Sequence, residues 1–263
     1  MKTFFLLLIF IIVLDINSFS QENFKVIKVN GTIVLKNKGV SLETGTVFSD
    51  KEDLIFRSED ATAAVINSQR GRLILTNNNH DPATAKSNFL PSMYNISTRG
   101  GSLGNIVDLK NLFSGKYVIL DKQYLTISET SFPMDKEHFF FLRYVYKGET
   151  INKKLPFSED TLFIDKKNLY TVDGNPIPSP DNTSITLFYM KGAEYVLINN
   201  FDLIFPDTRQ LKKEVQIILD EIKDKTFKEK LMEISAYINE QYGKVYQLDL
   251  LSWLEDNFGL TAE

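Results

Sequence analysis

The sequence lacks cysteine altogether, and its 263 residues include two histidines, His80 and His138. Without a thiol there is no cysteine nucleophile, no cysteine-based zinc site and no disulfide, so core burial alone must hold the fold. A serine–histidine–aspartate triad would have to use one of these two histidines. A zinc site usually needs three protein ligands, and two histidines in unrelated segments are a poor start for one.

The chain also lacks an excess of positive charge: its formal net charge is −4 at pH 7. A protein that binds nucleic acid is expected to carry a basic face that displaces counterions from phosphates. The same deficit argues against electrostatic binding to anionic lipid. The composition therefore predicts no nucleic-acid partner, and nothing in the sequence indicates a cofactor.

The longest apolar run, Phe4–Leu14, lies at the N-terminus. It follows Lys2, and the small residues Ser18 and Ser20 come soon after it. This is the layout of a secretory signal peptide, and the run is about half of the ~20 residues that cross a bilayer as a helix. We expect residues 1–20 to be removed, which leaves no stable membrane span and sends the mature chain to the periplasm or out of the cell. The alternative is a retained N-terminal anchor.

Short apolar segments of strand length follow one another through the next fifty residues. Polar or glycine turns separate them, and Asn30-Gly31 is a strong hairpin signal. Short strands at this spacing predict a small antiparallel β-sandwich or barrel over residues 21–76. The expected strands span residues 24–29, 32–36, 40–42, 47–48, 54–57, 63–66 and 73–75.

Residues 77–105 lose this pattern. They contain a polar segment before Pro82 and a glycine-rich segment that ends at Gly104, so a linker or long loop is expected at a domain boundary. A second β-rich stretch follows, in which His138–Tyr146 is the strongest strand signal. We expect an α+β domain over residues 106–263.

From about residue 208 the apolar residues switch to helical spacing. One stripe consists of Leu211, Val215, Ile218, Leu219 and Ile222. Asp207 or Thr208 can cap this helix, and Thr226–Glu229 is a capping box for a second one that Gly243 would end. A third helix is expected over about 247–257. The predicted fold class is mainly β with C-terminal helices.

The N-terminal strands also carry a family resemblance. Residues 29–48 read Val-Asn-Gly-Thr-Ile-Val and later Gly-Val-Ser-Leu-Glu-Thr-Gly-Thr-Val-Phe, residues 53–65 add a strand and small residues, and residues 71–75 read Gly-Arg-Leu-Ile-Leu. This succession resembles the FecR-like domain over about residues 24–75. The resemblance implies a small β domain of the cell envelope, used for signalling or for protein and glycan contacts, without catalysis. Residues 106–263 carry no such resemblance.

Acidic residues and histidines have the chemistry of a catalytic or metal site, but their pattern is weak. The acidic candidates are Asp50, Glu52, Asp53, Glu159 and Asp160. Two facing carboxylates would serve a glycosidase, yet charged residues in turns are usually solvated, and the same holds for the loop pair His80 and Asp81. The Gly100–Gly104 segment lacks the Lys-Ser/Thr ending of a phosphate loop. No catalytic, cofactor-binding or metal-binding residue is predicted.

The aromatic segment 138–146 has two rich faces if it is a strand, because side chains alternate along a strand. One face carries Phe139, Phe141, Arg143 and Val145, and the other carries His138, Phe140, Leu142, Tyr144 and Tyr146. This predicts a central strand that is covered on both sides. The alternative is an exposed aromatic platform for a sugar or a protein.

The sequence as a whole predicts a non-catalytic, exported cell-envelope interaction or scaffolding protein with a protein partner. The alternatives are an accessory signal-sensing domain protein and a glycan-binding protein or hydrolase. Two facing carboxylates beside aromatic residues in a cleft would favour the hydrolase, and an exposed apolar surface would favour a partner.

Cleavage after Ser20 can be tested directly. N-terminal sequencing of the mature protein should begin at Gln21, because Ser18 and Ser20 supply the small residues that flank a signal-peptide cleavage point. Full-length protein in the cytosolic fraction would contradict the assignment.

Overall fold

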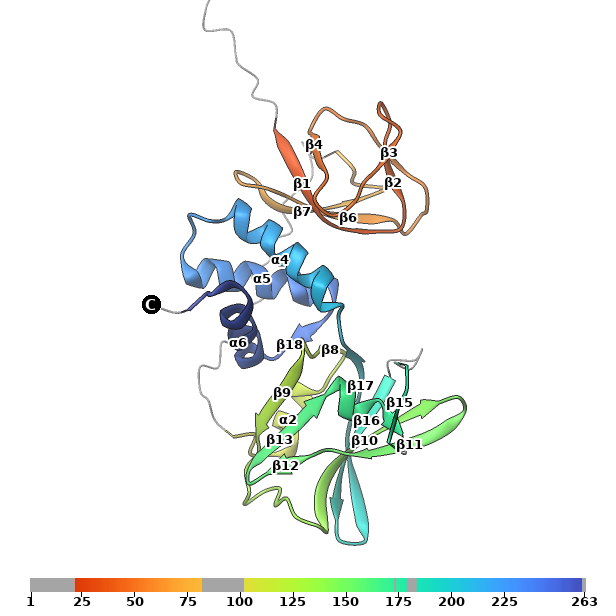
Figure 1. Cartoon of the computed structure of the whole chain (residues 1–263), viewed down its shortest axis with the longest axis vertical. Coiled ribbons are helices and arrows are strands. Elements are labelled where there is room, and N and C mark those ends of the chain that lie inside the picture. Colours follow the sequence, from red (N-terminus) through yellow and green to blue (C-terminus); the bar gives the residue numbers. More distant parts are fainter. Residues whose placement is uncertain (1–21, 82–101, 173, 179–183, 262–263) are drawn as a thin grey trace, which may run out of the picture. The chain divides into compact units, whose positions relative to one another are not determined.

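The chain forms two compact units, Met1–Asn88 and Phe89–Glu263. Both contain antiparallel sheets and helices follow towards the C-terminus, which confirms the predicted fold class (Figure 1). The computed structural model describes residues 22–81, 102–172, 174–178 and 184–261. The predicted signal segment 1–20 lies outside the described residues, as does most of segment 77–105, in which the two units divide.

In the N-terminal unit, the described strands form two antiparallel sheets ordered β4-β1-β6-β7 and β3-β2-β5. Phe24, Val26 and Phe48 of the first sheet share one core with Ile33 and Leu35 of the second. This is the arrangement of a small sandwich, in which alternate residues of each strand face inward. The strands are β1 Asn23–Asn30, β2 Ile33–Leu35, β3 Val40–Ser41, β4 Val47–Ser49, β5 Leu54–Phe56, β6 Thr62–Asn67 and β7 Gly71–Thr76.

The predicted hairpin at Asn30-Gly31 is wrong. Strand β1 pairs with β4 and β6, whereas β2 pairs with β3 and β5, so this turn carries the chain from one sheet to the other. Gly31 has a φ of 73°, and a Cβ there would lie 2.7 Å from Ser58 Oγ and 3.0 Å from Ala61 Cβ. The glycine is needed because the backbone passes close to a neighbouring turn in a left-handed conformation.

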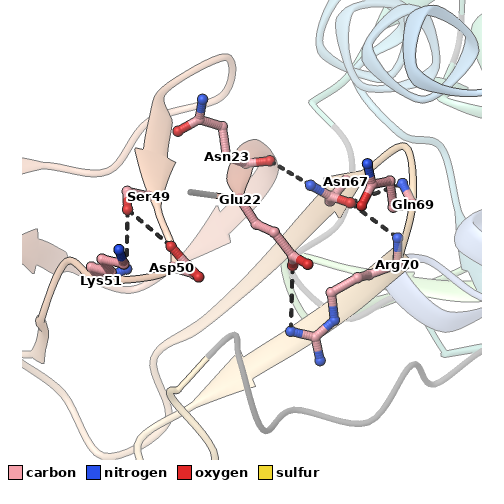
Figure 2. A network of polar contacts seen from close by, with 8 residues as sticks. All are labelled: Glu22, Asn23, Ser49, Asp50, Lys51, Asn67, Gln69 and Arg70. Atoms are coloured by element: carbon pink, nitrogen blue, oxygen red, sulfur yellow. Dashed lines mark hydrogen bonds and ion pairs between the residues drawn. The ribbon is translucent and has the colours of Figure 1, made fainter. Parts of the chain in front are cut away.

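A polar network fastens the start of β1 to the β6–β7 turn (Figure 2). Asn67 donates from Nδ2 to the Asn23 carbonyl oxygen at 2.8 Å, and its Oδ1 accepts the backbone N–H groups of Gln69 and Arg70 at 2.8 and 3.0 Å. Arg70 also lies 3.8 Å from a Glu22 carboxylate oxygen. These bonds satisfy the buried Asn67 amide, which therefore has a structural role.

The C-terminal unit is built on a six-stranded mixed sheet ordered β11-β10-β16-β17-β8-β18. Its first four strands are antiparallel neighbours, while β8 pairs in parallel with both β17 and β18. Smaller sheets have the orders β12-β13-β9 and β14-β15. The strands are β8 Lys116–Val118, β9 Lys122–Thr126, β10 His138–Tyr146, β11 Glu149–Lys154, β12 Phe157–Ser158, β13 Thr161–Asp165, β14 Thr171–Val172, β15 Asn175–Pro176, β16 Ser184–Lys191, β17 Glu194–Ile204 and β18 Lys244–Val245.

One face of the six-stranded sheet makes the core of this unit. Phe140, Leu142 and Tyr144 of β10 share a buried cluster with Leu125 of β9 and Leu162 of β13. Helix α2 (Ile106–Leu112) and the short α3 (Lys166–Leu169) contribute Leu109 and Leu169 to the same cluster. The opposite face of β10 therefore carries Phe141 and Arg143, as the alternation predicts.

Three helices follow the sheet: α4 Thr208–Glu221, α5 Phe227–Gln241 and α6 Gln247–Phe258. Asp207 caps α4 by accepting the N–H groups of Arg209 and Gln210, and Thr226 and Glu229 form the predicted capping box of α5. Leu211, Val215 and Ile218 of the predicted stripe are buried, so the stripe is confirmed for these residues, as are both caps. Within the described part of the chain, no helix has the length and apolar character to cross a membrane.

The glycine expected to end α5 does so, because its N–H donates to the Ile238 carbonyl oxygen at 3.0 Å, and it also has a second role. The helix ends at a cap on Tyr242, and Gly243 follows with a φ of 131°. A Cβ on Gly243 would lie 2.5 Å from the carbonyl oxygen of Lys116 in β8. Only glycine lets the chain approach the sheet this closely as it enters β18.

A buried carboxylate joins α4 to α5. Glu214 is fully buried and accepts hydrogen bonds from the Tyr237 hydroxyl at 2.8 Å, the Tyr242 hydroxyl at 2.6 Å and Gln210 Nε2 at 3.1 Å. Three donors offset the desolvation of this group. Burial and the hydrogen bond to Glu214 raise the pKa of the Tyr242 hydroxyl, so it keeps its proton and remains a donor.

A second buried polar group joins α6 to β9. Gln123 is fully buried and donates from Nε2 to Asp249 Oδ2 at 2.8 Å and to the Tyr117 hydroxyl at 2.5 Å. Its Oε1 has no hydrogen-bond partner among the residues that the structure describes. Burial raises the pKa of Asp249 to about 7, although the hydrogen bond from Gln123 lowers it.

Asp249 should make the folding stability depend on pH. Between about pH 4 and 7 the folded state keeps a proton that the unfolded state has released, so the free energy of unfolding falls as pH rises through this window and levels off above it. Asp249→Asn keeps an acceptor for Gln123 but cannot ionise. The variant should therefore be spared a fall in the free energy of unfolding on the order of 4 kcal/mol that the wild type shows across this window. Denaturant unfolding between pH 4 and 8 measures this, with the exposed Asp256→Asn as control. Parallel profiles for wild type and Asp249→Asn would contradict it.

Ile218 tests whether the apolar stripe of α4 holds the unit together. The side chain is fully buried, so Ile218→Asp would bury an unpaired charge and should cost several kcal/mol. Lys213→Asp, at an exposed position of the same helix, should change stability by less than about 1 kcal/mol. Thermal unfolding of both variants gives the comparison, and equal melting temperatures would show that the stripe does not contribute.

Candidate functional site

The two histidines lie in separate structural settings. His80 Nδ1 lies 2.9 Å from the Asn77 carbonyl oxygen, and its ring centroid is 6.1 Å from that of Phe56. His138 Nδ1 lies 3.0 Å from both carboxylate oxygens of Asp135, which also accepts the backbone N–H of His138. Each histidine therefore contacts the loop or strand end that carries it.

The acidic candidates of the N-terminal unit form ion pairs or hydrogen bonds with nearby side chains. Lys38 lies 2.5 Å from Glu52, and its hydrogen bond is the main reason why the pKa of Glu52 is lowered. Asp53 pairs with Lys36 at 3.1 Å. Asp50 accepts a hydrogen bond from Ser49 at 3.1 Å (Figure 2). These contacts are those of charged turns. Among the described residues, no group of three or more histidine or acidic side chains could hold a metal ion.

The acidic pair of the C-terminal unit also lies in a turn. Glu159 has a φ of 52°, and Asp160 accepts a hydrogen bond from the Thr161 hydroxyl at 3.0 Å. The turn connects β12 to β13 and gives the Asp160 carboxylate a local structural partner.

The glycine segment contains a further pattern that is typical of some hydrolases. Residues 100–104 read Gly-Gly-Ser-Leu-Gly, which formally matches the Gly-x-Ser-x-Gly sequence around nucleophilic serines. Gly100 and Gly101 lie outside the described residues. Leu103, next to Ser102, bridges to Ile127 in an extended conformation, and Ser102 makes no hydrogen bond with either histidine. The described residues thus lack the serine–histidine contact of a triad.

A pocket of about 320 Å³ lies at the start of α4. Lys166 and Arg209 line it together with Asp121 and Asp207. Asp207 already accepts the first free N–H groups of the helix, and these bonds lower its pKa. The pocket therefore has balanced charge, with its helix end already capped.

The face of the six-stranded sheet opposite the core gathers aromatic and polar side chains from four strands. Strand pairing arranges them in rows, because directly opposed residues of antiparallel strands lie on the same face. The polar row is Asn152, Arg143, Thr186 and Asn200; the next row is Lys154, Phe141, Phe188 and Leu197; the third is Phe139, Met190 and Tyr195. We call these eleven side chains the outer face.

An aromatic cluster lies in the middle of the outer face. The rings of Phe141 and Phe188 stack with centroids 5.0 Å apart and an interplanar angle of 11°. Tyr195 stands edge-on to both rings, at 5.9 and 5.2 Å. The two phenylalanines are 4% and 6% exposed, whereas Tyr195 is 52% exposed. The cluster thus offers solvent one large tyrosine on a fixed aromatic base.

Arg143 is held over this cluster. Its guanidinium carbon lies 4.5 Å from the ring centroid of Phe188 and 5.3 Å from that of Tyr195, distances typical of cation–π contacts. Its Nε donates to Asn152 Oδ1 at 2.7 Å. No described carboxylate pairs with Arg143. The terminal guanidinium nitrogens therefore remain able to bind an anion.

Lys154 adds a second cation beside the same rings. Its Nζ lies 3.9 Å from the ring centroid of Phe139 and 5.7 Å from that of Phe157. It too has no carboxylate partner among the described residues. The outer face therefore combines two cations, exposed apolar surface and amide groups.

The prediction for the aromatic strand is half right. Strand β10 does lie inside the sheet, between β11 and β16. The expectation that both its faces are covered holds at Phe141, which is 4% exposed, but not at Val145 on the same face, which is 53% exposed. Phe141 is buried by neighbouring side chains of its own face. The exposed platform is only the alternative prediction, because Phe188 and Tyr195 come from other strands and the pattern of one segment does not show that they join this face.

Family models, curated proteins and solved structures were all compared with the chain, and none matches it. The outer face is therefore interpreted from its own chemistry.

Proposed function

We propose that the chain is a non-catalytic, exported interaction or scaffolding protein of the cell envelope, and that its partner binds the outer face. The observation that carries the proposal is the setting of Arg143 on this face. It is fixed by aromatic rings and by Asn152, it has no described carboxylate partner, and the half-exposed ring of Tyr195 lies beside it. Arginine and tyrosine in such a setting are the residues that most often dominate binding energy at interfaces.

The exposed apolar area supports a binding role for this face. Tyr195 and Leu197 lie in adjacent rows and each exposes about half of its surface. Isolated exposed apolar residues are common, but a contiguous group rimmed by polar residues is typical of an interaction site. The fixed aromatic base means that little side-chain entropy would be lost on binding.

Export and the N-terminal module belong to the same proposal. Lys2, the Phe4–Leu14 run and the serines before Gln21 support secretion to the periplasm or beyond. The resemblance of residues 24–75 to the FecR-like domain supports a module that makes contacts in the envelope. The sandwich of the N-terminal unit is compatible with that resemblance.

A non-catalytic role is supported by how the candidate residues are used. Glu52 and Asp53 pair with lysines of neighbouring turns, and His138 contacts Asp135 at the start of its own strand. A glycoside hydrolase needs two facing carboxylates in a cleft. The outer face carries cations, amides and aromatic rings instead.

Site-specific photocrosslinking in living cells tests the proposal. A photoreactive amino acid at position 195 should give a discrete adduct of higher mass in the envelope fraction, because Tyr195 projects from the proposed binding face. The matched control is position 124, since Tyr124 is a tyrosine of similar exposure, 47%, on strand β9.

Three results would contradict the proposal. One is the same adduct pattern from positions 195 and 124, which would mean that contact is not localised. Another is recovery of the chain in the cytosol. Loss of the adduct on His80→Ala or His138→Ala, in a variant that still folds, would likewise contradict a role without the histidines.

A further inference from the structure

The polar row of the outer face offers hydrogen-bond donors at a regular spacing. Asn152, Arg143, Thr186 and Asn200 are directly opposed on four successive strands. Neighbouring strands lie about 4.8 Å apart, so the row extends over roughly 14 Å. This is the length of a short chain of sugar rings or of a few extended residues.

The side chains of the row form hydrogen bonds with one another that occupy the amide oxygens and leave amide N–H donors unused. Asn152 Oδ1 accepts from Arg143 Nε at 2.7 Å, and Asn200 Oδ1 accepts from the Thr186 hydroxyl at 2.6 Å. Both amide oxygens are thus occupied, while neither Nδ2 group has an acceptor among the described residues. Asn152 and Asn200 are exposed, so a ligand can reach these donors.

The row beside it supplies an apolar surface. Tyr195 and Leu197 are exposed next to the buried Phe188 ring. An aromatic ring presents a negative face to the polarised C–H groups of a molecule lying against it. A ligand on the outer face therefore needs acceptors along one edge, an apolar surface along the other and an anionic group at Arg143.

We infer that the outer face binds a carboxylated oligosaccharide. The inference rests on the proposed function and specifies the partner. The carboxylate pairs with the terminal nitrogens of Arg143, whose planar fork matches a carboxylate in bidentate geometry. Sugar hydroxyls accept from Asn152 and Asn200, and the C–H face of a ring lies against Tyr195.

An acidic peptide is the rival ligand, and the geometry favours it less. Peptides are usually bound by addition to a sheet edge, by a helix in an apolar groove or by an aromatic-lined groove. The outer face is the broad side of a sheet. Its amide donors alternate with a guanidinium along one line, which suits a ring with several hydroxyls and one carboxylate.

Calorimetric titration of the mature chain with defined oligosaccharides tests the inference. The probes are hexamers of galacturonate and of mannuronate and a hyaluronan hexamer, with methyl-esterified galacturonate hexamer as the uncharged match. We expect at least one carboxylated probe to bind, and its uncharged form to bind at least tenfold more weakly. Higher salt should weaken binding, because a charge pair contributes.

Variants localise the binding. Arg143→Lys keeps the charge but loses the planar fork, and Tyr195→Ala removes an exposed ring without touching the core. Each should weaken binding at least tenfold, whereas Tyr124→Ala should bind like wild type. Thermal unfolding checks that the variants fold, and Asn200→Ala serves as a surface variant that should weaken binding if Arg143→Lys does not fold.

The outcomes separate the inference from the proposed function. Binding of none of the carboxylated probes overturns the inference, and so does tighter binding of a hexaglutamate peptide than of any saccharide. In either case a specific adduct at position 195 would leave the interaction role standing with a protein partner. Equal binding by wild type and Tyr195→Ala would also overturn it, since the saccharide would then sit elsewhere.

Discussion

The architecture of the C-terminal unit depends on the period-two alternation of strand β10. Phe140, Leu142 and Tyr144 point into the core, and burial of three large side chains from one strand fixes its position in the sheet. The same geometry forces Phe141 and Arg143 to the other side. A shift of one residue would exchange the two sets, so the core and the outer face are specified together.

The outer face is formed by the register of the strand pairing, because no single segment carries all of its residues. Phe141, Phe188 and Tyr195 belong to three strands, and they meet because β10 pairs with β16 and β16 with β17. A bulge between Leu187 and Phe188 shifts the last pairing and helps to set which residues of β17 join the face. Strand pairing thus brings the residues of the proposed binding face together. The residues that contact Arg143 include some that lie far from it in the sequence.

The sequence predicted local features well and long-range ones poorly. The capping box of Thr226 and Glu229 and the stripe through Ile218 need only neighbouring residues, and the structure has both. Asn30-Gly31 marked a turn correctly, but the partner of β1 depends on pairings that no local signal contains. The same limit applies to the outer face: alternation placed Phe141 and Arg143 together, whereas Tyr195 and Asn200 needed the register. The burial of Gln123 against Asp249 likewise joins distant segments.

Strand β8 has a consequence for the order of events during folding. Its neighbours on both sides, β17 and β18, come much later in the chain, and both pair with it in parallel. Pairings between distant segments form slowly, because a long loop must close first. The sheet therefore stays incomplete until β17 and β18 have been made. For a protein that is proposed to leave the cytoplasm, this delay would keep the polypeptide open enough to thread through a secretion channel before it acquires its final shape.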